Sequence, residues 1–250
     1  MSLLVCAPCR ADVPAPPAPP PVPVGYCSSI SAELTADLLA FNTLLAIPPT
    51  WTPIPGGPTL YAGNLMWANG NTGPSISNPT YLQTTVQPQL QELKALGVQA
   101  IVVPVLFPIL YEPFYGSQAA YQPYLTFYTG VAQAIRAAGL KIIVDNEILF
   151  SNDTAAGWTN MNAFYGPLTW PEYIAARATM AATIVQYMQP DYLVLANEPD
   201  TEAAQTGQQN LKNPVDAAQM VQAEITAVQN YLQTATVSPI PKLGAGFGSW

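Results

Sequence analysis

Two glutamates of this 250-residue chain stand where short apolar runs end, and both could do proton chemistry. Glu198 follows the run 192–196 and lies between an asparagine and a proline, and Glu147 follows the run 140–144. Burying such a polar group without a partner costs on the order of 1–3 kcal/mol. A strand that ends in this way turns out to solvent or delivers its carboxyl group to a site. Paired carboxyl groups can share the roles of proton donor and nucleophile.

The composition excludes several other kinds of chemistry. The chain has no histidine, which removes Ser-His and Cys-His catalysis and most zinc sites. Its net charge is −8, with 15 acidic and 7 basic residues, so we expect no nucleic-acid partner. Half of the residues are hydrophobic, yet no apolar run reaches the roughly 18 residues that a transmembrane segment needs. Carboxylates, amides and aromatic rings therefore remain as the groups that could act.

The first 30 residues are expected to be a leader remnant followed by a proline-rich linker. Prolines dominate residues 13–24, which is typical of a stiff polyproline II spacer that builds no core. Cys6 and Cys9 form a C-x-x-C that we interpret as part of the leader, since no βαβ unit surrounds it. The sequence does not decide whether Cys6, Cys9 or Cys27 forms a disulfide or carries a lipid. This layout favours a secreted or cell-surface protein.

The folded part is predicted to span residues 31–250. Residues 31–45 have the apolar spacing of a helix, and a repeating pattern of strands and amphipathic helices begins near residue 60. A capping box at residues 169–172 and Asn-Pro pairs at 78–79 and 213–214 mark helix starts. Strands are expected at residues 60–67, 98–106, 140–144, 192–196 and 242–247.

This alternation predicts an α/β fold with a parallel sheet and helical crossovers. An open doubly wound sheet and a closed (β/α)8 TIM barrel both fit it. No Gly-rich turn follows the first strand, as a dinucleotide site would require. Polar residues instead end several strands, and in a barrel these ends share the face that carries the active site. We therefore predict a barrel, present as about four βα units plus strand five. Such a chain would be the N-terminal portion of a longer protein, and a self-contained half barrel is the alternative.

The triplet Asn197-Glu198-Pro199 resembles the Asn-Glu-Pro motif of the clan A retaining glycoside hydrolases, which are (β/α)8 barrels. The resemblance covers roughly residues 58–250 and places Glu198 on the fourth strand, as the general acid/base. It implies that Asn197 binds the 2-hydroxyl of the sugar and that no metal or organic cofactor is needed. It also places the nucleophile on a seventh strand, which this chain does not contain. The 250 residues alone are therefore expected to be inactive.

Further sugar contacts are expected at the same strand ends. Asn64, Asn146 and Glu147 could bind hydroxyl groups, and Trp67 and Trp250 could stack on sugar rings. Other aromatic residues after strand ends are weaker candidates: Phe107, Tyr111, Phe114, Tyr115, Trp158 and Tyr165. A retaining pair of carboxyl groups lies about 5 Å apart and an inverting pair roughly 6.5–9.5 Å apart. Glu147 could therefore also be the partner of Glu198 in an inverting pair.

Departures from the clan leave the family within it open. Several of its families carry an arginine near the end of the second strand and histidines around the acid/base. Here Arg136 and Arg177 fall in predicted helices, and histidine is absent. The competing hypothesis is a non-catalytic carbohydrate-binding or surface scaffold protein on the same fold. Under both hypotheses the partner is a carbohydrate. The sequence does not decide which sugar or linkage is recognised, whether the action is endo or exo, or what the oligomeric state is.

Overall fold

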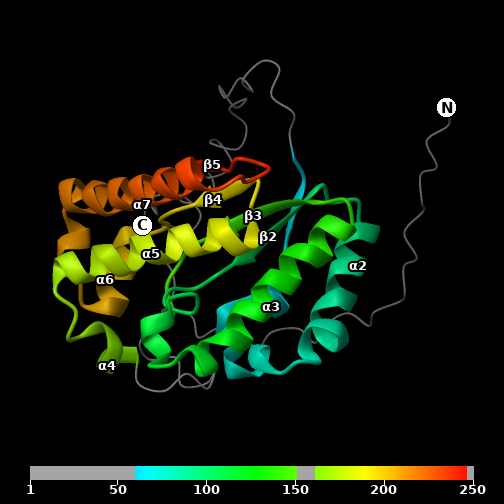
Figure 1. Ribbon diagram of the computed structural model, residues 1–250, viewed down its shortest axis with the longest axis horizontal. Helices are drawn as coiled ribbons and strands as arrows, with labels where there is room; N and C mark the ends of the chain where they lie inside the picture. The colour runs from blue at the N-terminus through cyan, green and yellow to red at the C-terminus, as the bar shows by residue number, and fades with distance from the viewer. Residues whose placement is uncertain (1–59, 151–160, 247–250) are drawn as a thin grey trace, which may run out of the picture. The chain divides into compact units, whose positions relative to one another are not determined.

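The computed structural model describes residues 60–150 and 161–246, in which strands and helices alternate (Figure 1). The predicted linker, the helix at 31–45, Trp158 and Trp250 lie outside these residues. The strands are β1 (Ala62–Asn64), β2 (Ala100–Pro104), β3 (Lys141–Asp145), β4 (Tyr192–Val194) and β5 (Lys242–Gly244). The α-helices are α2 (Gln87–Ala95), α3 (Gln118–Ala137), α4 (Met161–Tyr165), α5 (Trp170–Met188), α6 (Pro199–Thr206) and α7 (Pro214–Thr234). Shorter helical turns are η1 (Met66–Ala68), η2 (Gly70–Ser77), η3 (Leu82–Val86), η4 (Glu112–Tyr115) and η5 (Gln209–Lys212).

The five strands form one parallel sheet in the order β1-β2-β3-β4-β5. A doubly wound sheet would reverse this order at a switch point, whereas successive units of a barrel follow one another around the sheet. Since parallel crossovers are almost always right-handed, crossovers in one direction place their helices on one face. The predicted α/β class and its barrel-type succession of units are therefore confirmed.

The two faces of the sheet differ in burial. On the helix-covered face Ile142, Val144 and Leu193 are fully buried, whereas Ile143 and Val194 on the opposite face are only half-buried. The apolar run of the fourth strand is therefore buried on one face only, because among the described residues only that face carries helices. Strand alternation then places successive side chains at a strand end on opposite sides of the sheet.

Local signals set the helix boundaries as expected. The capping box is present at α5, where the Thr169 amide donates to Glu172 Oε2 at 2.8 Å. Asn213 caps α7 by accepting from the Val215 amide at 3.0 Å. Pro88 lies in the first turn of α2, and a π-helical turn, η3, precedes the helix there.

Two features differ from the prediction. The first strand ends at Asn64, and Met66–Ala68 forms a 3-10 turn, so Trp67 leaves the sheet. Helix α6 begins directly after Glu198 and was not predicted. Within residues 60–150 and 161–246, no helix combines the length and the apolar character that crossing a membrane requires.

Candidate functional site

The ends of β3 and β4 bring three of the predicted site residues together. Glu147, Asn197 and Glu198 line one cavity of about 50 Å³, beside Ile148, Phe150, Thr201 and Glu202. The parallel pairing of β3 with β4 explains this meeting, because Asp145 is in register with Val194 and both chains leave the sheet at the same edge. The cavity therefore lies at the carboxyl edge of the sheet, where barrel enzymes hold their active sites.

Glu198 has an unusual backbone conformation. Its φ of 50° and ψ of 64° lie in the left-handed region, which costs a residue with a side chain roughly 1–2 kcal/mol. The residue is the N-cap of α6, and its Oε2 accepts a hydrogen bond from the Thr201 hydroxyl at 3.0 Å. Strain of this kind persists where the surrounding structure imposes it, often at functional sites.

The side chain of Asn197 connects the two strand ends. Its Nδ2 donates to Glu147 Oε1 at 3.0 Å and makes a longer contact of 3.5 Å with Asp145 Oδ2. On its other side it meets Gly246, whose amide donates to Ala196 O at 2.7 Å. A Cβ at Gly246 would lie 2.6 Å from Asn197 Oδ1, so only glycine allows this close approach.

Gly246→Ala is expected to displace the Asn197 side chain and weaken its hydrogen bond to Glu147. The loss of about one partly buried hydrogen bond should lower the free energy of unfolding by about 0.5–1.5 kcal/mol, measured by urea denaturation. Gly244→Ala is the matched control, because a Cβ there meets no atom within 4 Å. Equal changes in the two variants would contradict the close contact with Asn197.

Asp145 holds a proton more readily than an ordinary aspartate. Burial and the neighbouring Glu147, with which it shares a hydrogen bond, raise the pKa of Asp145 to about 7, although Arg177 and Asn197 act in the opposite direction. Asp145 and Glu147 are thus neighbouring carboxyl groups at the end of β3, and burial favours the protonated form of Asp145.

A charged cluster is buried between the sheet and its helices. Arg177 of α5 is fully buried, and its Nε lies 3.4 Å from Glu202 Oε1 of α6 and 3.2 Å from Glu224 Oε1 of α7. The Tyr173 hydroxyl donates to Glu202 Oε1 at 2.5 Å, and Asn146 Nδ2 donates to Glu224 Oε1 at 3.2 Å. The cluster therefore joins three helices to the end of β3.

Electrostatics within this cluster favour one proton on Glu224. Burial, opposed by Arg177 and reinforced by Glu202, raises the pKa of Glu224 to about 8. For Arg177, burial acts to lower the pKa, but Glu202 and Glu224, together with Tyr173 and Tyr165, bring it above its ordinary value. At neutral pH the protonated Glu224 leaves Arg177 balanced by Glu202, which reduces the cost of burying charge.

Other predicted site residues do not reach the cavity. Asn146 is fully buried on the helix side, where its Oδ1 accepts from Arg177 at 3.3 Å. Asn64 is exposed on β1, and Trp67 is 51% exposed, with its backbone amide donating to Gln89 Oε1 of α2 at 3.0 Å. The structure thus assigns Asn146 a place in the charged cluster, because strand alternation turns it away from Glu147.

The aromatic side chains after β2 lie in the core or pack against it, and Tyr165 of α4, which follows β3, packs with them. Phe107 and Tyr165 are fully buried, with ring centroids 6.2 Å apart, and the Tyr165 hydroxyl donates to Phe107 O and Leu149 O at 3.0 and 2.8 Å. Phe114 and Tyr115 pack edge to face at 4.9 Å. Packing thus accounts for the positions of these rings, and none of the four lines the cavity at the carboxyl edge.

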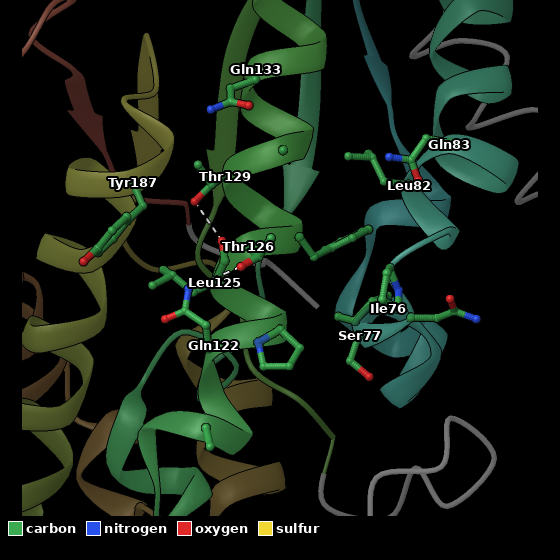
Figure 2. A pocket seen from close by; sticks show the side chains of 16 residues that line it. Ile76, Ser77, Leu82, Gln83, Gln122, Leu125, Thr126, Thr129, Gln133 and Tyr187 are labelled. Carbon is green, nitrogen blue, oxygen red and sulfur yellow. Dashed lines mark hydrogen bonds between the residues drawn. The ribbon is translucent and has the colours of Figure 1, made fainter.

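A second, larger pocket lies on the helix layer (Figure 2). It has a volume of about 900 Å³ and is lined by η2, η3 and α3, together with Tyr187 of α5. Ile76 and Leu82 flank α3 from one side in Figure 2, and Tyr187 flanks it from the other. None of the predicted site residues that the structure describes lines this pocket.

Sequence reasoning missed Arg177, Glu202 and Glu224 as members of the site. A signal was present for Arg177, which lies four residues after Tyr173 and three before Met180, on the apolar face of its helix. In a chain with only 9% charged residues, an arginine on an apolar face indicates a buried ion pair.

No family model matches this chain, and no curated protein was found as a relative. Among solved structures, its fold is similar to that of a β-glucosidase from Exiguobacterium marinum (17% identity, TM-score 0.47, 67% of this chain and 38% of that one). A β-glucosidase from Thermotoga maritima in complex with deoxynojirimycin has 14% identity and a TM-score of 0.49, with 77% and 49% covered. β-Glycosidase BGL167 has 14% identity and a TM-score of 0.47, with 76% and 55% covered. The chain spans about two fifths to just over half of the length of these three proteins.

The arrangement at the carboxyl edge suits proton transfer. It offers the carboxyl groups of Glu147 and Glu198, an aspartate (Asp145) with a raised pKa, and an amide that joins the two strand ends. Within the described residues, no group of three or more Cys, Asp or Glu side chains could hold a metal ion. The chemistry that these residues support is general acid/base catalysis.

Proposed function

We propose that this chain is the N-terminal part of a retaining glycoside hydrolase that cleaves a β-linked oligo- or polysaccharide, with Glu198 as general acid/base. One observation carries the proposal: Glu198, strained into the left-handed region, lines a cavity with Glu147 and Asn197 at the carboxyl edge of a sequentially ordered parallel sheet. An enzyme of this kind protonates the leaving oxygen with one carboxyl group and attacks the anomeric carbon with another.

The cavity is much smaller than the roughly 300–1,000 Å³ of a typical ligand pocket. In our proposal the described residues form one wall of the sugar site. The nucleophile, a glutamate on a seventh strand, and the remaining wall come from a part of the protein beyond this sequence. A sugar 2-hydroxyl would take over the hydrogen bond that Asn197 Nδ2 now donates to Glu147, leaving Glu147 to accept from another hydroxyl group.

The stereochemistry of hydrolysis tests this proposal. In a protein extended to carry the seventh strand, hydrolysis of an aryl β-glycoside followed by ¹H NMR is expected to release the β-anomer first. Release of the α-anomer would instead indicate inversion by Glu147 and Glu198. Sugar binding by calorimetry without turnover would favour the non-catalytic binding protein, and absence of both binding and turnover would overturn the proposal.

A further inference from the structure

A single guanidinium group holds both strand ends from which the candidate site is built. Arg177 Nη1 donates to Glu147 O at 3.1 Å, and Nη2 donates to Asn146 O at 2.9 Å and to Leu195 O at 2.8 Å. Glu147 is itself a cavity residue, and Leu195 lies two residues before Asn197. The backbones that carry the two partners of the Asn197–Glu147 hydrogen bond are therefore tied to the same side chain.

We infer that Arg177 is a positioning residue for this site, which sets the distance between the end of β3 and the end of β4 so that Asn197 meets Glu147 beside Glu198. The inference rests on the proposed function for its catalytic meaning. Its structural content is independent of that function, because it concerns only where Asn197 and Glu147 are held.

The surroundings fix the guanidinium in its plane. Its Nε side faces Glu202 and Glu224, and the ring of Phe107 lies 5.6 Å from the guanidinium carbon. The two Nη groups are thus directed at the strand ends. A planar fork with fixed donor directions can bind several carbonyl groups at once, whereas the ammonium group of lysine is a single point charge. Charge and geometry can therefore be separated experimentally.

Arg177→Lys keeps the positive charge beside Glu202 and Glu224 but removes the fork. In the uniformly ¹⁵N-labelled 250-residue chain, we expect the Asn197 side-chain amide protons to exchange with solvent about tenfold faster than in the wild type, as expected for loss of one buried hydrogen bond. Their signals, assigned by their absence in Asn197→Asp, should also move towards the shifts of a solvated amide. The backbone amide spectrum reports whether the variant is folded.

Arg136→Lys is the matched control. Arg136 also donates from Nη2 to backbone carbonyls, of Met188 and Gln189, but these lie at the end of α5 away from the cavity. This variant should leave the Asn197 signals unchanged. If Arg177→Lys does not fold, Arg177→Gln/Glu202→Gln, which removes one positive and one negative charge together, is measured in its place with the same expectation.

Unchanged Asn197 exchange and shifts in a folded Arg177 variant would overturn the inference, since Arg177 would then support the core without positioning the site. Failure of the extended protein to hydrolyse or bind sugars would leave this readout unaffected. The proposed function and the positioning role can therefore fail separately.

Discussion

Glu198→Gln is expected to lower kcat/KM by about 10²–10⁴-fold on glycosides with poor leaving groups, in a protein extended to carry the seventh strand. The leaving oxygen of such a substrate needs a proton as the glycosidic bond breaks, and glutamine cannot supply one. Glycosides of acidic phenols leave without this help, so their kcat/KM should change by less than about tenfold. The measurement is a plot of log kcat/KM against the pKa of the leaving phenol, which should become steeper in the variant.

Asp200→Asn is the control for this experiment, since Asp200 is exposed in the first turn of the same helix, two residues after Glu198. Its plot should follow that of the wild type. A loss in Glu198→Gln that is the same for every leaving group would exclude Glu198 as the acid, because a purely structural effect does not depend on the phenol.

Arg177→Met should lower the free energy of unfolding by about 3–5 kcal/mol, because it leaves the Glu202 carboxylate buried without its cation. Glu202 and Glu224 are both at most 1% exposed, so water cannot replace the lost contacts without opening the packing of α5, α6 and α7. Urea denaturation of the 250-residue chain at pH 7 measures this change.

The triple variant Arg177→Met/Glu202→Gln/Glu224→Gln tests whether the loss of stability comes from unbalanced buried charge or from the altered packing of the cluster. Without any net buried charge, it should recover more than half of the stability that the single variant loses. A single-variant loss under about 1 kcal/mol would show that the cluster is solvated and would contradict its burial.

The fold could be predicted from the sequence because its signals are local and repeated. The local signals are the apolar periodicity, the capping box at Thr169 and Asn213 before Pro214. Each acts within one or two helical turns, so it can be recognised without knowing which residues pack against the helix. Strand lengths could not be predicted as well, since β1 and β4 end where pairing with their neighbours ends.

The face that a helix buries proved harder to predict than the helix itself. The sequence predicts one apolar face for α7, with Val221, Ile225, Val228 and Leu232, but the residues that the structure buries are Ala217, Met220, Glu224 and Val228. Apolar spacing alone does not identify Glu224, a charged residue, as part of the buried face of α7. Its burial depends on Arg177, which is distant in sequence and contributed by another helix.

Part of the candidate site could be predicted from the sequence. Glu147, Asn197 and Glu198 meet because parallel strands share a carboxyl edge, which is a general property of the fold. Asn146 is separated from them by alternation along β3, and Trp67 by a 3-10 turn whose start the sequence does not mark. General rules of topology thus locate the site, while the side of the sheet on which each residue lies depends on exact register.

Pro199 gives the backbone of Glu198 a further consequence. A residue before proline is disfavoured in the right-handed helical region, because the proline ring collides with its backbone and Cβ. Growth of helix α6 backwards by one residue, which would take Glu198 into its first turn, is therefore disfavoured. Such growth would remove Glu198 from the left-handed conformation in which it lines the cavity. Pro199 thus favours the conformation in which Glu198 stays beside the cavity that it lines.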